Sequence, residues 1–273
     1  MNGSILERTA ERLSAEPPFG LDGVTPPVPP FAPAAAGLRR LTGFHGAEPT
    51  VEFLAGLRAA PLRGGFGFML DRDDALQAIA LVDEVVSDLP DPLTEECIAP
   101  LRADFTAIHR SLGYRAHPAE RDWMTGEGKP VAGLADSLRR WRQRAGLSLD
   151  GLPPDNLPLN EPPLAAGPAP DHLVSELDLL ATLLEHGQAA DATLFLDQHP
   201  LRWVPGFCSR VATRCREPFY AGVAILTAAH LDHLRDLLAG ACGLPRPAEE
   251  DGDDTRRRRW TEGRLPRTCG CDS

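Results

Sequence analysis

Apolar residues recur through most of this chain at intervals of three and four, the spacing that places them on one face of an α-helix. No run of alternating apolar and polar residues flanked by hairpin turns is present. The apolar stripes are Ala75, Ile79, Val82 and Val86; Ile98, Leu101, Phe105, Ile108 and Leu112; Leu134, Leu138 and Trp141; Leu173, Leu177, Leu180 and Leu184; and Tyr220, Val223, Leu231, Leu234 and Leu238. This pattern predicts an all-α fold.

Proline and acidic residues predict where several helices begin. Proline is tolerated in the first helical turn, where its missing N–H is not needed, and a carboxylate there meets the positive end of the helix dipole. On these grounds we expect helix starts at Asp91-Pro92, at Pro170-Asp171, at Pro205 and at Pro218. A short helix is expected over residues 191–198, and Gly187 is expected to end the helix that starts at Pro170.

Two proline-rich stretches, residues 17–33 and 152–170, interrupt the helical pattern. Because proline fixes φ and removes a hydrogen-bond donor, we expect neither stretch to be helical. We predict a short helix plus a proline-rich arm over 1–40, an N-terminal helical half over 41–151, a proline-rich hinge over 152–170, a C-terminal helical half over 171–243 and a disordered charged tail over 244–273. Exchange of halves between protomers through the hinge is one hypothesis for a homodimer; a monomer is the other.

The chain carries a net charge of −11, which excludes a nucleic-acid partner because phosphate binding needs a basic face. A cationic partner suits this charge better. Ten acids fall between Asp71 and His109: Asp71, Asp73, Asp74, Asp83, Glu84, Asp88, Asp91, Glu95, Glu96 and Asp104. A solvated helix face and an electrostatic landing site for a cationic partner both remain open as explanations.

The sequence lacks an apolar run near the ~20 residues that span a bilayer, and its first residues do not resemble a secretory signal. We therefore expect a cytoplasmic protein without stable membrane insertion, whose six cysteines are mostly reduced. Cys269 and Cys271 form a C-x-C pair that could hold a soft metal, although a reactive pair of tail thiols explains them more simply. Phosphate-loop, dinucleotide and nucleophile-elbow motifs are absent, and no cofactor is expected.

His172 and Glu176 stand four positions apart near a predicted helix start, and Asp171 and Ser175 are spaced in the same way. A carboxylate beside a histidine can serve acid–base catalysis. Neither a nucleophile nor a metal ligand lies nearby in sequence. We therefore favour a polar lock that fixes the helix start, with catalysis as the alternative.

Three stretches in the second half resemble the TorD/DmsD/NarJ-type redox-enzyme maturation chaperones. PDHLVSELDLLATLL (170–184) is similar to the family's E-P-D-H-L signature, FLDQHPLRWVPGFCSRV (195–211) to its H-L-x-x-W-x-P-x-F segment, and EPFYAGVAILTAAHLD (217–232) to the start of its last helix. PLRADFTAIH (100–109) resembles an upstream segment, and AHPAERDW (116–123) is a degenerate form of another.

This resemblance implies about ten helices in two halves joined by a hinge. It also implies binding of the twin-arginine leader, or of the apo catalytic subunit, of a molybdenum-cofactor oxidoreductase, which delays export until the cofactor is inserted. The client-binding and hinge positions carried over by motif are Asp171, His172, Ser175, Glu176, Trp203, Pro205, Phe207 and Asp104. The alternatives are a metal- or Fe–S-handling accessory protein that uses the C-x-C, and an unrecognised enzyme at the Asp171–Glu176 cluster.

Overall fold

The computed structural model describes residues 31–69, 71–111, 114, 116–126, 129–130, 133–147 and 168–247. Within these ranges nearly all regular structure is helical, and the all-α prediction is confirmed. The α-helices are α2 (Ala32–Gly46), α3 (Val51–Ala59), α4 (Asp73–Asp88), α5 (Glu95–His109), α6 (Leu134–Arg144), α7 (Leu173–Glu185), α8 (Ala189–Gln198), α9 (Pro200–Arg214) and α10 (Pro218–Cys242). Single 3₁₀ turns occur at Leu62–Gly65, Gly67–Met69 and Glu120–Asp122, and β1 (Thr125–Gly126) pairs antiparallel with β2 (Lys129–Pro130).

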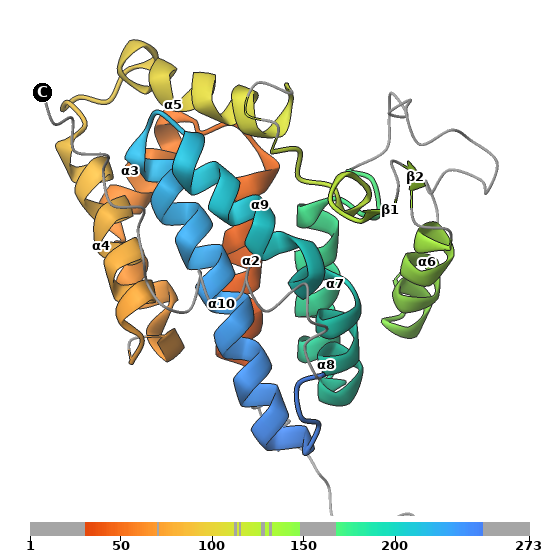
Figure 1. Ribbon diagram of the computed structural model, residues 1–273. Coiled ribbons are helices and arrows are strands. Elements are labelled where there is room, and N and C mark those ends of the chain that lie inside the picture. The colour runs from red at the N-terminus through yellow and green to blue at the C-terminus, as the bar shows by residue number, and fades with distance from the viewer. Residues whose placement is uncertain are drawn as a thin grey trace, which may run out of the picture.

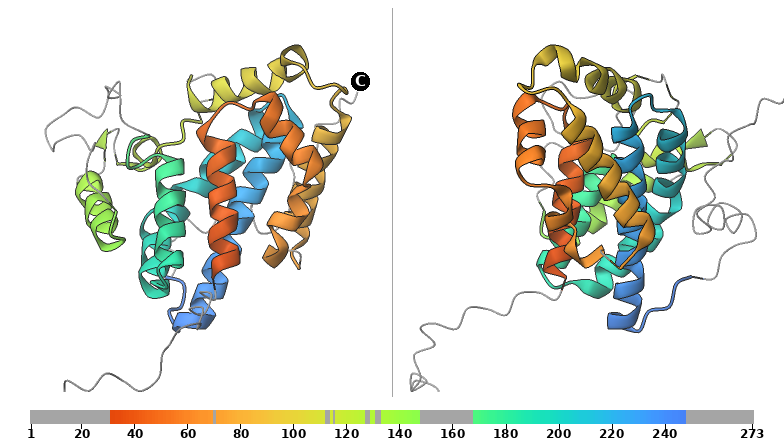
Figure 2. Two further views of the ribbon diagram at one scale, coloured as in Figure 1. Left: turned by 180° about the vertical axis from the view of Figure 1, so that it is seen from behind. Right: turned by 90° about the vertical axis from the view of Figure 1, so that its left-hand side faces the viewer.

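Helix α10 runs through the middle of the bundle and packs against α4, α9, α8 and α2 (Figure 1). Helix α2 packs in turn against α7, and the view from behind shows α2 between α7 and α4 (Figure 2). Helix α5 crosses one end of the bundle, while α6 stands at its edge beyond α8 (Figure 1). Helices from before and after residues 148–167 thus alternate in space, and their buried side chains form one core.

The predicted apolar stripes form this core, apart from Leu112, which lies outside the described residues. All four leucines of the α7 stripe are fully buried, and the five α10 stripe residues are at most 2% exposed. Helices α7 and α10 are each followed by a glycine with positive φ, Gly187 at 71° and Gly243 at 64°, a conformation that glycine adopts without steric cost. Helix α10 begins at Pro218, as predicted.

Helices α4 and α10 approach each other closely at Gly222. A Cβ atom at this position would lie 2.6 Å from Cγ2 of Val82 and 3.1 Å from the carbonyl oxygen of Ala78. Only glycine fits this approach without displacing the partner helix. The contact draws the acidic helix α4 onto the central helix.

Three predicted helix starts are wrong. Helix α5 begins at Glu95 rather than at Asp91-Pro92, because the Thr94 hydroxyl accepts the Cys97 N–H and caps the helix there. Helix α9 begins at Pro200, and Pro205 lies inside it; the buried face of α9 outweighs the backbone hydrogen bond that Pro205 cannot donate. Helix α7 begins at Leu173, after Pro170 and Asp171.

The predicted arm and hinge are described only at their edges. Helix α2 starts at Ala32 and extends past residue 40, so the end of the 17–33 stretch is helical; Pro33 stands in the first turn, where proline is tolerated. The short N-terminal helix, residues 152–167 of the hinge, and the tail beyond residue 247 lie outside the described residues. In the ranges described, no helix combines the length and the apolar character that crossing a bilayer requires.

Candidate functional site

The segment Ala116–Trp123, here called the junction loop, lies along the residues that precede α7. The backbone N–H of Leu173 donates to the carbonyl of Pro118, and the N–H of Glu120 donates to the carbonyl of Asp171, both at 2.8 Å. Ala119 and His172 form an isolated antiparallel bridge. These bonds join AHPAERDW to PDHL, two of the stretches on which the family resemblance depends.

An ion pair between Asp171 and Arg121 reinforces the junction. Nη2 of Arg121 donates to Oδ1 of Asp171 at 2.6 Å, and Asp171 is only 4% exposed. Burial raises the pKa of Asp171, while the Arg121 charge opposes that shift. Ser175 does not contact Asp171 as its spacing suggested, because its hydroxyl donates to the carbonyl of Pro168 at 3.1 Å.

His172 is the N-cap of α7. Its Nδ1 accepts the N–H of Val174 at 3.2 Å and so satisfies a backbone donor that the helix leaves free. Burial, followed by the charges of His117 and Arg121, lowers the pKa of His172 to about 4, so the ring is neutral near pH 7. The prediction that His172 and Glu176 bond to each other is wrong. His172 accepts the Val174 N–H, whereas Glu176 accepts the indole N–H of Trp203.

Glu176 and Glu120 form a buried carboxyl pair. Oε2 of Glu176 accepts the indole N–H of Trp203 at 3.0 Å, and Oε1 has no donor among the described residues. Burial first, and then the neighbouring charge of Glu120, raise the pKa of Glu176 well above its usual range. Two ionised carboxylates cannot hydrogen-bond to each other. A proton on Glu176 removes the repulsion between the two carboxyl groups.

His199 extends this pair toward α6. Its Nδ1 lies 2.8 Å from Oε2 of Glu120, and its Nε2 lies 3.0 Å from the hydroxyl of Ser137. Both Glu120 and His199 are nearly inaccessible to solvent. The network therefore joins the junction loop, α6, α7 and α9. We call its members the motif cluster: Glu120, Arg121, Asp171, His172, Glu176, His199 and Trp203.

Aromatic and imidazole rings pack behind the motif cluster. Phe207 is fully buried, and its ring centroid lies 5.9 Å from that of Trp203 and 6.0 Å from that of His45. His45 and His109 are 5.4 Å apart, and both ring nitrogens of His109 lack a partner in the described structure. Burial lowers the pKa of His45 to about 3 and that of His109 well below its usual value.

Asp104 is engaged elsewhere. Its carboxylate accepts the backbone N–H groups of Arg216 and Glu217, at 2.7 and 2.6 Å, and the hydroxyl of Tyr114 at 2.5 Å. The first two bonds anchor the chain immediately before α10 to α5. These contacts support a structural role for Asp104, whereas its motif predicted a client-binding or hinge position.

Most predicted site residues are buried. Asp104, Asp171, Ser175, Glu176, Trp203 and Phe207 are each at most 8% exposed, whereas His172 and Pro205 are partly exposed. Such residues can shape a binding surface, but few of them can touch a partner directly. The surface next to them belongs to the junction loop and to α9.

This partly exposed edge, here called the rim, consists of His117, Asp122, Trp123, Pro205 and Arg210. Nδ1 of His117 lies 2.5 Å from Oδ2 of Asp122, and the Trp123 indole donates to the His117 carbonyl at 2.8 Å. The guanidinium of Arg210 lies 4.2 Å from the Trp123 ring centroid. The rim therefore combines a carboxylate with an indole face that already holds a guanidinium.

The acidic stretch does not form the opposite wall of a groove at this rim. Helix α4 lies across α10 and α2 from α7 (Figures 1 and 2). Six of the ten acids have partners among the described residues: Asp74 with Arg72, Asp83 with the Leu62 N–H, Asp104 as described above, Glu95 with Arg102, Asp91 with Arg58 and Asp71 with His233. The seven exposed ones are Asp71, Asp73, Glu84, Asp88, Asp91, Glu95 and Glu96.

The described residues contain no group of three or more His, Cys, Asp or Glu side chains placed to hold a metal. Cys208 is buried, and burial raises its thiol pKa above the ordinary range. Cys269 and Cys271 lie outside the described residues.

Sequence reasoning missed Glu120, Arg121 and His199 as site residues. Glu120 and His199 bond to each other across 79 positions, a separation that no local spacing reveals. All three nevertheless lie inside the stretches AHPAERDW and FLDQHPLRW, which carry the resemblance. Their position within these stretches was the available signal.

Residues 75–209 of the chain match the family described as nitrate reductase delta subunit. The match begins in α4, includes the junction loop and all seven residues of the motif cluster, and ends within α9. No curated protein shows significant similarity to the chain.

Proposed function

We propose that this chain, whose residues 75–209 match the nitrate reductase delta subunit family of redox-enzyme maturation chaperones, binds the apo catalytic subunit of a molybdenum-cofactor oxidoreductase, and in particular the twin-arginine leader of that subunit. Binding would delay export until the cofactor has been inserted. The protein would act in the cytoplasm, as a monomer or a homodimer.

The motif cluster is the observation that carries this proposal. It lies entirely within the segment matched to the family, and it fixes the junction loop against α7 and α9 through buried bonds. Its two carboxyl groups are closed off from solvent, and the Ser137 hydroxyl 3.0 Å from Nε2 of His199 belongs to the same hydrogen-bonded network. An arrangement of this kind preorganises a surface, here the rim, for binding rather than for chemistry.

The rim suits the arginines of a leader. A guanidinium binds well to a carboxylate and to an indole face, and Asp122 and Trp123 offer one of each. Arg210 already lies on the Trp123 ring. A leader arginine would displace Arg210 from the ring and pair with Asp122, which also bonds to His117. The exposed acids of α4 would act at longer range by attracting the cationic leader.

Calorimetric titration with a synthetic twin-arginine leader peptide tests this function. We expect binding that weakens about ten-fold or more when both arginines are replaced by lysine, because lysine cannot reproduce the planar stacked contact. Asp122→Asn and Trp123→Phe should weaken binding, whereas Asp136→Asn, an exposed acid on α6, is the matched control.

Two results would argue against the proposal in different ways. Equal binding of the arginine and lysine peptides would remove the leader as the recognised element. Loss of binding in a Glu84→Gln/Asp88→Asn variant, with Asp122→Asn unaffected, would move the site from the rim to α4. Co-purification from native cells would then identify the bound catalytic subunit.

A further inference from the structure

A cleft of about 640 Å³ opens between α6 and α8, on the side of α6 that faces the bundle. It is lined by Ser137, Arg140, Trp141, Gln143, Arg144, Leu194 and Gln198. Leu194 is 41% exposed and is one of two large exposed apolar side chains in the part of the chain that is described. The cleft therefore offers an apolar contact next to basic side chains.

The charge of this cleft is opposite to that of the whole chain. Helix α6 carries Arg139, Arg140, Arg142 and Arg144 but one acid, Asp136, which pairs with Arg139. Arg144 lies over the Trp141 ring at 5.3 Å and reaches Asp191 at 3.3 Å. Arg140 is exposed and has no hydrogen bond or ion pair with any described residue. An uncompensated guanidinium at an apolar cleft favours an acidic occupant.

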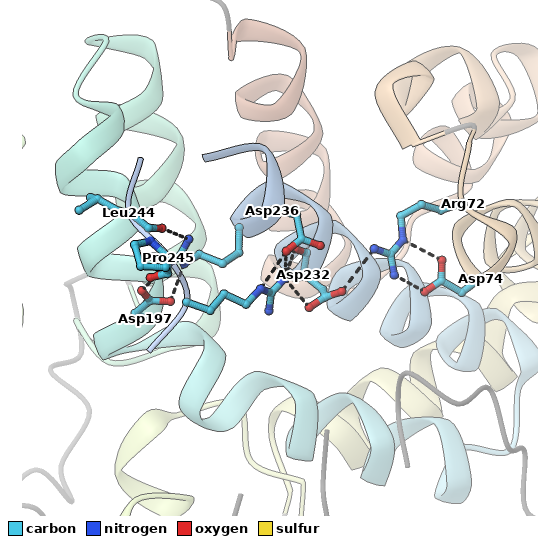
Figure 3. Close-up of polar contacts among 9 residues, drawn as sticks. Arg72, Asp74, Asp197, Asp232, Asp236, Leu244 and Pro245 are labelled. Carbon is cyan, nitrogen blue, oxygen red and sulfur yellow. Dashed lines mark hydrogen bonds and ion pairs between the residues drawn. The ribbon is translucent and has the colours of Figure 1, made fainter. Parts of the chain in front are cut away.

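The segment after α10 leads the chain to this region. Arg235 is fully buried, and its guanidinium pairs with both carboxylate oxygens of Asp197 on α8. The guanidinium also donates hydrogen bonds to the backbone carbonyls of Leu244 and Pro245, at 3.0 and 2.9 Å (Figure 3). We call this arrangement the C-terminal clamp. Its effect is to turn the chain back from the end of α10 and hold it beside α8, where the dark-blue segment ends in Figure 1.

The clamp and the cleft meet on the last turn of α8. Asp197 belongs to the clamp, while the next residue, Gln198, lines the cleft and accepts the Trp141 indole N–H at 3.2 Å. A helix with its side chains is about 10–12 Å across. Residues 248–254 would span up to about 23 Å if extended, at roughly 3.3 Å per residue. They are long enough to pass around α8 and reach the cleft.

Five carboxylates occur among residues 249–254: Glu249, Glu250, Asp251, Asp253 and Asp254. We propose that this acidic run occupies the α6–α8 cleft of the same chain, pairing with Arg140 and Arg144 and covering Leu194. The short connection from residue 247 gives the run a high effective concentration at the cleft, so it has an advantage over any acidic segment in solution. The contact would fasten α6 to the bundle.

Hydrogen–deuterium exchange of the full chain tests the proposal. Replacing the five acids by Gln or Asn should speed exchange of the α6 amides about five-fold or more, and so should Arg140→Glu. The matched controls are Glu84→Gln/Asp88→Asn for the acids and Arg63→Glu for the cleft arginine, and neither should change exchange in α6. Unchanged exchange in both test variants would overturn the proposal.

Reversing the charges of both proposed partners gives a second, independent test. Arg140→Glu combined with Glu250→Lys and Asp251→Lys should restore slow exchange in α6, because the pair is re-formed with its signs swapped. A synthetic peptide of residues 248–255 should bind the neutralised-tail variant and be excluded from the wild-type chain. Protection of α6 that grows with protein concentration would mean that a second copy supplies the acids, and would overturn the intramolecular assignment.

Protection that depends on Asp150, Asp155 and Glu161 instead would identify residues 148–167 as the occupant and would likewise overturn it. None of these measurements involves a leader or a client. The outcome is therefore independent of the function proposed above.

Discussion

The C-terminal clamp and the motif cluster both bury charged side chains, but they compensate the charge in different ways. In the clamp the single buried cation, Arg235, meets an opposite charge and two carbonyl oxygens, so its donors are used (Figure 3). In the motif cluster Glu176 faces another carboxyl group, and one of its oxygens has no donor in the described structure. The first arrangement is typical of a structural anchor.

The second arrangement is typical of a functional site, because perturbed pKa values and unsatisfied buried groups concentrate where a protein does its work. The motif cluster also gathers residues from four segments, whereas the clamp ties one helix to the chain that follows it. We therefore expect substitutions in the clamp to act on stability alone. Substitutions in the motif cluster should act on stability, on its pH dependence and on client binding together.

The largest effect is expected for Arg235→Ala. It leaves Asp197 in a buried position without its partner, and breaking a buried ion pair in this way costs about 3–5 kcal/mol. Chemical denaturation at pH 7 measures the loss, and binding of the leader peptide by the folded fraction should be unchanged. A loss below about 1 kcal/mol would mean that water reaches Asp197 and that the pair is not a buried anchor.

Acid should destabilise the protein through its buried histidines. The pKa of His45 is lowered to about 3 and that of His172 to about 4, from a value near 6.5 in the unfolded chain. Their contribution is complete above pH 6.5 and is lost as the pH falls from 6.5 toward 4, because the unfolded state then binds more protons. Each such group contributes a slope of about 1.4 kcal/mol per pH unit.

Replacing His172 by Asn tests this slope and keeps the helix cap, since an Asn side-chain oxygen also accepts the Val174 N–H. The slope of the unfolding free energy against pH, measured between pH 6.5 and 4, should fall by the contribution of one proton. His186→Asn, at an exposed histidine, is the control. An unchanged slope in His172→Asn would contradict the burial of the ring.

Trp203→Phe should have an intermediate effect, because it removes the donor to the buried Glu176 carboxyl. An unsatisfied buried acceptor costs about 1–3 kcal/mol. Trp123→Phe, where the indole donates to a partly buried backbone carbonyl, is the matched control and should cost less. Thermal unfolding of both variants at one pH separates them.

Glu176→Gln sharpens the same test. The amide oxygen can still accept the Trp203 N–H, and the amide N–H can donate to Glu120, so we expect stability within about 1 kcal/mol of wild type at neutral pH. Since the pKa of Glu176 is raised, the wild type should lose stability as the pH rises through that pKa, and the variant should lose less. Parallel profiles of unfolding free energy as the pH rises above 4.5 would mean that Glu176 is not held protonated.

The sequence predicted the helices better than it predicted their ends. The stripes of α7 and α10 were readable because four leucines, or a run such as Leu231, Leu234 and Leu238, recur at helical spacing and are all buried. The start of α9 was not readable, because Pro200 and Pro205 send the same local signal. Burial of Trp203 and Phe207 decides between them.

The site was predictable to a similar degree. Asp171, His172, Glu176 and Trp203 were identified by motif, and the structure brings them together. Their bonding partners were not predictable, because Arg121 and Glu120 reach the cluster across 50 and 79 positions in sequence. Spacing along one helix suggested that His172 and Glu176 bond to each other. Contacts between distant segments determine their actual partners.

The smallest effect is expected for Arg246→Ala, next to the clamp. Arg246 pairs with Asp232 and Asp236 at 2.8 and 2.7 Å, but its side chain is 23% exposed and that of Asp236 is 56% exposed. Ion pairs of this kind contribute about 0–1 kcal/mol and weaken with salt. Denaturation at low and high ionic strength should therefore show a small loss that salt abolishes. The loss of unfolding free energy could instead be as large as that of Arg235→Ala and independent of salt. That result would show that all the ion pairs drawn in Figure 3 hold the segment after α10, and that the anchor extends beyond Arg235 and Asp197.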